Sequence, residues 1–179
     1  METENKIKIL FLCTGNSCRS QMAEAFTRHL IKDRIEAHSA GIAPKAVDPR
    51  AIKAMSEIGI DISRQQSKST ADIKGTEFDF VITLCDNAQK TCPTFPAKTS
   101  VFHMGFDDPP KLAANSRDEE EAMAHYRRVR NEIKVFVERL PDILKQKKEN
   151  MVFDQTRFVA GLKSVMGQLP HHLKRTEDS

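Results

Sequence analysis

The sequence predicts an α/β protein in three layers, with a central four-stranded parallel sheet covered on both faces and an additional helical extension at the C-terminal end. Short apolar runs alternate with segments of helical periodicity between Ile7 and Leu140. A glycine-containing loop joins the first apolar run to the first helical segment, as is typical of anion-binding α/β proteins. The 179 residues suffice for one domain with its own core.

Four apolar runs are the expected strands. They are Ile7–Cys13, Ile35–Ser39, Phe80–Cys85 and Thr99–His103. Strands that alternate with helices pair in parallel, and their carboxyl ends then meet at one edge of the sheet. We therefore expect the loop after the first strand to lie at that edge.

Three longer segments have helical periodicity. They are Ser20–Lys32, Pro49–Ile58 and Glu119–Leu140. Pro49 suits the first turn of its helix, where no backbone N–H is required. Pro141 is expected to end or kink the last helix.

The sequence divides into a main domain at 1–147 and a helical extension at 148–179. The polar segment 145–150 is expected to connect them. An apolar stripe at helical spacing follows at Phe158, Leu162, Val165, Met166 and Leu169, and ends at Pro170. The stripe indicates either an added helix packed on the domain or a surface for a partner or a second copy.

Composition excludes several functions. The chain has 28 basic and 25 acidic residues, which are interspersed, so we expect no nucleic-acid partner. No apolar stretch is long enough to span a membrane, and residues 1–6 lack the apolar region of a signal peptide. We expect a cytoplasmic protein without membrane attachment, in which the 4 cysteines remain thiols.

Residues 13 to 20 read Cys-Thr-Gly-Asn-Ser-Cys-Arg-Ser, which indicates a loop that binds a tetrahedral oxyanion at a helix N-terminus. The Cys13 thiol is the expected nucleophile, with a pKa lowered by the local field. Arg19 offers a planar fork to the anion. Asn16 suits a left-handed turn. The backbone N–H groups expected to hold the oxygens are those of Thr14, Gly15, Asn16, Ser17, Cys18 and Arg19. The plainer interpretation is a buried, inert Cys13 with a surface Arg19.

The sequence resembles the low-molecular-weight tyrosine phosphatases and the arsenate reductases built on the same fold. The matching segments cover residues 13–24, 39–41, 83–86, 92–93 and 105–109. The match therefore concerns the whole main domain. It also marks Ser20, which closes the loop, as a catalytic residue.

Chemistry separates the two branches. A phosphatase needs one cysteine, whereas reduction of arsenate takes two electrons, which thiols supply by forming a disulfide. Cys85 is the last residue of the third apolar run, and Cys92 comes seven positions later. The thioredoxin-coupled arsenate reductases are similar in Cys13 and in both later cysteines. The resemblance thus implies reduction of arsenate, a role in arsenical resistance, thioredoxin as the partner and no bound cofactor.

The implied reaction passes through these three cysteines in order. Cys13 attacks arsenic, and Cys85 then forms a disulfide with Cys13. Cys92 next attacks Cys85, which leaves a Cys85–Cys92 disulfide that thioredoxin reduces. We expect residues 86–91 to form a helical turn that unwinds during this exchange. Alternatively, Cys85 is a core residue and Cys92 a chance thiol. The spacing lacks the close pairs of a zinc site, so we expect no metal there. Cys18 is expected to point inward and to take no redox step.

Asp108 is the expected general acid, because Pro109 restricts its backbone to an extended conformation over the pocket. Asp107 is the competing carboxylate, and an ordinary solvated turn is the plainer alternative. The acid loop of the phosphatases carries aromatic residues, whereas here Tyr126, the single tyrosine, lies far downstream. This favours a small inorganic oxyanion over an aryl phosphate.

Some reductases of the family hold potassium behind the loop, at positions that correspond here to Asn16, Glu24 and Ser39. Lys68 stands where an acidic ligand would be needed. We expect its ammonium group to pair with Glu24 in place of the ion, and activity to be independent of potassium. Otherwise, Lys68 is a surface side chain.

Two other functions remain open from the sequence. A phosphatase acting on phosphotyrosine or a small phosphoester would need Cys13, Arg19 and Asp108 but neither Cys85 nor Cys92. An oxyanion-sensing or redox-regulated binding protein would hold the anion without turnover.

Overall fold

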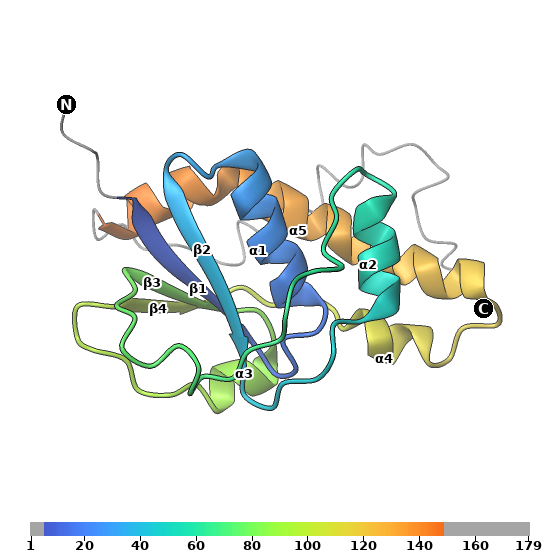
Figure 1. Ribbon diagram of the computed structural model, residues 1–179, viewed down its shortest axis with the longest axis horizontal. Coiled ribbons are helices and arrows are strands. Elements are labelled where there is room, and N and C mark those ends of the chain that lie inside the picture. The colour runs from blue at the N-terminus through green and yellow to red at the C-terminus, as the bar shows by residue number, and fades with distance from the viewer. Residues whose placement is uncertain (1–5, 149–179) are drawn as a thin grey trace.

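A computed structural model describes residues 6–148 and confirms the expected parallel sheet (Figure 1). The elements in chain order are β1 Ile7–Cys13, α1 Arg19–Leu30, β2 Ile35–Gly41, α2 Pro49–Ser56, β3 Phe80–Thr83, α3 Asp86–Lys90, β4 Ser100–His103, α4 Pro109–Ala113 and α5 Glu119–Lys148. No helix within this range is long and apolar enough to cross a membrane.

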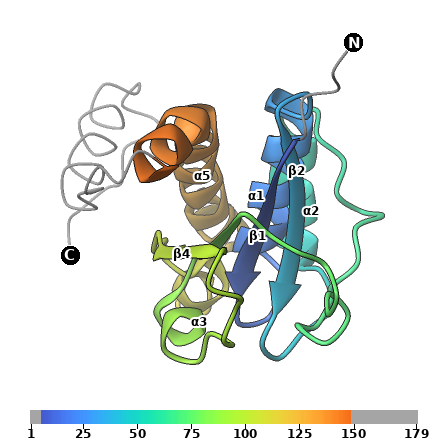
Figure 2. The same ribbon diagram turned by 90° about the vertical axis from the view of Figure 1, so that its left-hand side faces the viewer.

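The four strands lie in the order β2-β1-β3-β4 and all pair in parallel. Cys13 lies opposite Gly41, and Thr83 lies opposite both Leu12 and His103. Because the strands share one direction, the segments that follow β1, β3 and β4 emerge at the same edge. Figure 2 shows α3 beside this edge, toward which the strand arrows point. The edge therefore holds the loop with Cys13, the segment with Cys85 and the segment with Asp108.

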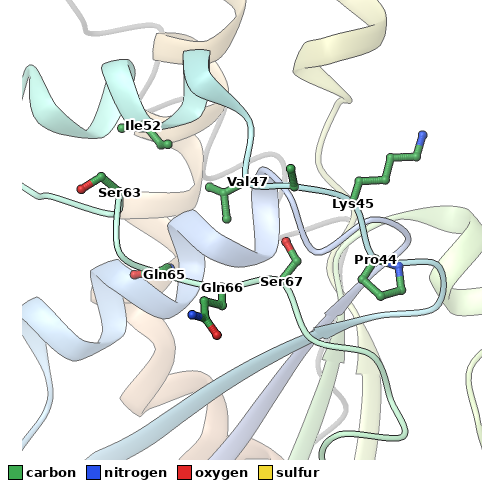
Figure 3. Close-up of a pocket in the computed structure, with 9 residues that line it drawn as sticks. Pro44, Lys45, Val47, Ile52, Ser63, Gln65, Gln66 and Ser67 are labelled. Atoms are coloured by element: carbon green, nitrogen blue, oxygen red, sulfur yellow. The ribbon is translucent and has the colours of Figure 1, made fainter.

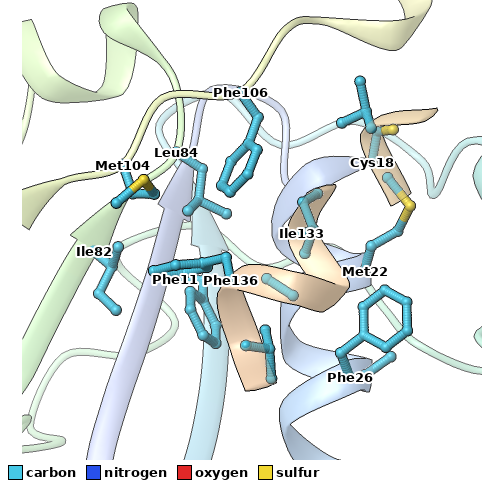
Figure 4. Packing of buried hydrophobic residues seen from close by; sticks show 14 of the residues in the cluster. Phe11, Cys18, Met22, Phe26, Ile82, Leu84, Met104, Phe106, Ile133 and Phe136 are labelled. Carbon is cyan, nitrogen blue, oxygen red and sulfur yellow. The ribbon is translucent and has the colours of Figure 1, made fainter. Parts of the chain in front are cut away.

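One face of the sheet carries the larger apolar core. Phe11 of β1 packs there with Met22 and Phe26 of α1 and with Phe136 of α5 (Figure 4). Helix α2 joins the same core through Ala51, Ala54 and Met55. The opposite face carries a smaller apolar cluster that includes Cys13, Cys85 and Ala88. Residues of the segment that follows α3 pack against this cluster. The sheet thus has cover on both faces, but most of the helical cover is on one.

The C-terminal helix differs from expectation, because α5 continues through Pro141 to Lys148. The expected end at Pro141 is wrong. Ile143 and Leu144 are buried beyond the proline, and the Lys147 ammonium lies 5.0 Å from the centre of the Phe102 ring, so packing holds this last stretch as helix. The first residues of the expected connector are therefore helical. The extension proposed for 148–179, with its apolar stripe, lies outside the described residues apart from Lys148.

Candidate active site

The loop between β1 and α1 has the expected left-handed turn at Asn16, with φ of 44°. The Asn16 amide donates to the hydroxyls of Ser20 (2.9 Å) and Ser39 (2.8 Å), and its oxygen accepts from the backbone N–H of Lys68 (2.8 Å). Gly41 packs directly beneath, since a Cβ there would lie 2.8 Å from the Asn16 nitrogen. One side chain thus fixes the shape of the loop, and the fully buried Ser20 supports that shape.

Arg19 joins the loop to the segment that carries the acid. Its Nη1 donates to the carbonyl oxygen of Phe106 (2.9 Å), and its Nη2 lies 3.4 Å from Asp108 Oδ1. The buried Arg19 Nε is one of two buried side-chain polar atoms in the described region that lack a hydrogen-bond partner. A bound oxyanion would supply that partner, because guanidinium N–H groups bind such oxygens well.

The structure separates the two candidate acids. Asp107 forms an ion pair with Arg128 of α5 (2.8 Å), whereas Asp108 faces Arg19. Asp108 directly precedes α4 without capping it through its side chain, so its carboxyl group is not committed to the helix. Asp108 is therefore better placed than Asp107 to protonate a group bound in the loop. The short helix α4 itself was not expected from the sequence.

Two sulfurs lie side by side at the carboxyl edge of the sheet. Cys13 Sγ and Cys85 Sγ are 3.9 Å apart, although 72 positions separate them in the chain. Both side chains are nearly buried, with residue exposures of 4% and 7%. Cys85 caps the N-terminus of α3, where its sulfur accepts from the Ala88 N–H (3.4 Å) and lies 3.3 Å from the Thr14 hydroxyl oxygen. The arrangement places a second thiol within reach of the first.

The charge of this pair differs from the expected one. Hydrogen bonds from Cys13, then from Thr14 and the Ala88 N–H, lower the pKa of Cys85 to about 5. The hydrogen bond to Cys85, together with burial, raises the pKa of Cys13 above its ordinary value, although Arg19 opposes this. The expectation of a lowered Cys13 pKa is therefore wrong for the resting pair. The hydrogen bond between the two sulfurs therefore favours the thiol form of Cys13 and the thiolate form of Cys85 in the resting pair.

The other two cysteines occupy different environments. Cys92 is partly buried and packs against the smaller cluster that contains Cys85; burial raises its pKa. Cys18 points into the larger core beside Met22, as expected, and burial also raises its pKa (Figure 4). All four cysteines are thiols in this structure.

The predicted lysine contact lies behind the loop. Lys68 Nζ is 3.7 Å from Glu24 Oε2, and the same buried carboxylate pairs with Arg28 (2.5 Å) and accepts from the Ser39 hydroxyl. The expected pairing of Lys68 with Glu24 is confirmed. Within residues 6–148, no group of three or more His, Cys, Asp or Glu side chains could hold a metal ion.

Two further features lie outside the site. A groove of about 510 Å³ beside the loop is lined by residues of segments 44–47 and 63–67 and by Ile52, and neither Cys13 nor Cys85 lines it (Figure 3).

Tyr126 is buried, and its hydroxyl donates to Asp48 (2.7 Å). The single tyrosine is therefore engaged in the structure and does not offer a stacking surface for an aryl group.

The fold and this loop define a family. Residues 8–150 match the model of the low molecular weight phosphotyrosine protein phosphatase family, and the chain belongs to it. Within this family it is 49% identical over 129 residues to an arsenate reductase of Halalkalibacterium halodurans, covering 72% of this chain and 91% of the relative. It is 47% identical over 134 residues to the arsenate reductase of Bacillus subtilis, covering 73% and 91%.

Solved structures agree with this placement. An arsenate reductase in the oxidized state has a TM-score of 0.63 and 33% identity, covering 74% of this chain and 95% of that one. A low molecular weight protein tyrosine phosphatase from T. tengcongensis has a TM-score of 0.57 and 25% identity, covering 76% and 99%. The fold is therefore common to both activities, and the site must distinguish them.

Proposed function

We propose that this protein reduces arsenate to arsenite with electrons from Cys13 and Cys85, and that thioredoxin returns it to the reduced form. The observation that carries the proposal is the 3.9 Å separation of these two sulfurs. A phosphatase has no need of a second thiol beside its nucleophile. The identity of 47–49% to arsenate reductases supports the same choice.

In the first step, the Cys13 sulfur attacks arsenic and displaces one oxygen. Arg19 and the loop N–H groups hold the other oxygens, as in oxyanion stabilisation generally. The Asp108 carboxyl protonates the departing oxygen, which leaves as water. The proton on Cys13 passes to the hydrogen-bonded Cys85 sulfur as the sulfur–arsenic bond forms.

In the second step, the Cys85 proton passes to an oxygen of the arsenic group, which leaves as protonated arsenite, and the Cys85 sulfur attacks the Cys13 sulfur. The electron pair of the sulfur–arsenic bond stays with arsenic, so arsenic is reduced by two electrons and each sulfur is oxidised by one. Arsenite leaves and a Cys13–Cys85 disulfide remains. Thr14 and the Ala88 N–H favour the Cys85 thiolate that this attack requires.

In the third step, Cys92 attacks Cys85, which frees Cys13 and leaves a Cys85–Cys92 disulfide. Helix α3 lies between these two cysteines. Thiols seven positions apart on a helix do not have disulfide geometry, so α3 must rearrange. Thioredoxin then reduces the new disulfide by thiol exchange.

Phosphatase activity is the second candidate function, because Cys13, Arg19 and Asp108 alone suffice for it and the family model is that of a phosphatase. Arsenate and phosphate share shape and charge, so one loop accepts both. The two activities differ in their need for Cys85.

The test measures arsenite production with thioredoxin, thioredoxin reductase and NADPH. Wild type should turn over repeatedly, and Cys85→Ser should not. Cys18→Ser is the matched control, since this thiol lies in the core. Repeated turnover by Cys85→Ser would contradict the relay. Cleavage of p-nitrophenyl phosphate without arsenite production would identify a phosphatase, and anion binding without either reaction a sensor. Replacing thioredoxin by glutaredoxin and glutathione tests the reductant.

A further inference from the structure

One imidazole spans the two residues on either side of Leu84–Cys85. His103 Nδ1 lies 2.9 Å from the Thr83 hydroxyl oxygen, and His103 Nε2 lies 3.4 Å from Asp86 Oδ1. Thr83 is the last residue of β3 and Asp86 the first of α3. His103 therefore contacts both sides of the junction where the chain passes from strand to helix.

Local structure favours this placement. Thr83 and His103 lie opposite each other in the β3–β4 register. A Cβ at Gly105 would lie 2.9 Å from His103 Nε2, so glycine leaves room for the ring. With its proton on Nε2, the neutral ring accepts from the Thr83 hydroxyl and donates to the Asp86 carboxylate. Both contacts are thus available without a charged imidazole.

The two contacts differ in environment. The Thr83 contact is largely shielded, since Thr83 is buried and the His103 side chain is 11% exposed. The Asp86 side chain is 83% exposed, so solvent screens its contact. The Thr83 contact should therefore contribute more to the position of the junction, and the Asp86 contact should respond more easily when α3 moves.

We propose that His103 is a positioning residue for the second sulfur, holding the β3–α3 junction so that Cys85 lies against Cys13 and opposing the unwinding of α3. The proposal rests on the proposed function. The first disulfide requires the sulfurs to approach from 3.9 Å to about 2.0 Å, which side-chain motion provides while the junction stays fixed. Exchange with Cys92 requires α3 to rearrange, which breaks the contact between His103 and Asp86.

The proposal predicts opposite effects on two steps. A single turnover with arsenate and no thioredoxin is quenched by alkylation, and the Cys13–Cys85 and Cys85–Cys92 disulfides are counted by mass spectrometry. In His103→Ala the first disulfide should form about threefold to tenfold more slowly, as for the loss of one hydrogen bond. Its exchange to Cys92 should be as fast as in wild type or faster.

Two substitutions separate the contacts. His103→Asn places an amide near the position of Nδ1 and should restore most of the rate of the first step through Thr83. Asp86→Ala, at an exposed position, should leave the first step unchanged and speed the exchange by about twofold. Protection of Cys13 against alkylation by inorganic phosphate reports whether the anion loop is intact, and should match wild type in every variant.

The outcomes are distinguishable. If His103→Ala changes neither rate, or slows both steps and weakens phosphate protection together, the positioning role is wrong. If wild type itself forms no Cys13–Cys85 disulfide with arsenate, the proposed function fails instead.

Discussion

Substitution of Thr14 by valine tests how the second sulfur is charged. The hydrogen bond from Cys13 is the largest cause of the low Cys85 pKa of about 5, burial opposes it, and Thr14 makes the largest lowering contribution outside the sulfur pair. The Asn87 amide nitrogen donates to the Thr14 oxygen (3.1 Å), which leaves the hydroxyl proton to the Cys85 sulfur at 3.3 Å. Valine keeps the shape of threonine but removes this donor, so the Cys85 pKa should rise.

The size of the effect follows from one hydrogen bond to an ionised acceptor. Such a bond contributes about 1.5 kcal/mol, which corresponds to a rise of about one pKa unit. Raising a thiol pKa means that the thiolate appears only at higher pH. Near pH 5.5, the thiolate fraction should fall from about three quarters to about one quarter, whereas near pH 8 it should not change.

The ultraviolet absorbance of the thiolate, followed across an acid-to-neutral titration, measures this directly. The thiolate absorbance that appears at the lowest pH in wild type should appear at a higher pH in Thr14→Val. Asn87→Ala is the matched control, because it removes the neighbouring contact and keeps the donor. An unmoved step in Thr14→Val, or an equal shift in Asn87→Ala, would refute the assignment of charge to Cys85.

Three further predictions follow from the site. Cys92→Ser should produce one equivalent of arsenite and then stop even with thioredoxin present, because no third thiol is left to attack the Cys13–Cys85 disulfide; continued turnover would contradict this. Asp108→Asn should slow single-turnover arsenite formation by about a hundredfold or more, while Asp107→Asn should change it by less than about threefold; equal losses would mean that the acid is misassigned. Wild type should react equally fast in sodium and potassium buffers, because the Lys68 ammonium already lies beside Glu24; a rate that follows potassium would show otherwise.

The sequence predicted the parts of the site that depend on neighbours in the chain. The turn at Asn16 follows from a strand, a short loop and a helix in succession, and its positive φ agrees. Asp108 was singled out by the proline that follows it. The choice between Asp107 and Asp108 needed the structure, because Arg128, which binds Asp107, comes from a distant helix.

Other features could not be predicted because distant residues decide them. The positive charge of Arg19 in the loop lowers the pKa of Cys13, but the hydrogen bond to the Cys85 sulfur raises it more. Only the fold brings these two sulfurs together. Proline predicts helix ends from backbone chemistry alone, whereas α5 passes Pro141 because Ile143 and Leu144 are buried beyond it. His103 gave no signal at all, since its contacts come from the strand register.

The most direct test of the electron source is a single turnover of Cys92→Ser with arsenate, without thioredoxin, followed by counting of arsenite and mapping of disulfides. We predict one Cys13–Cys85 disulfide for each arsenite released. Arsenite formed while both thiols remain open to alkylation would contradict the account.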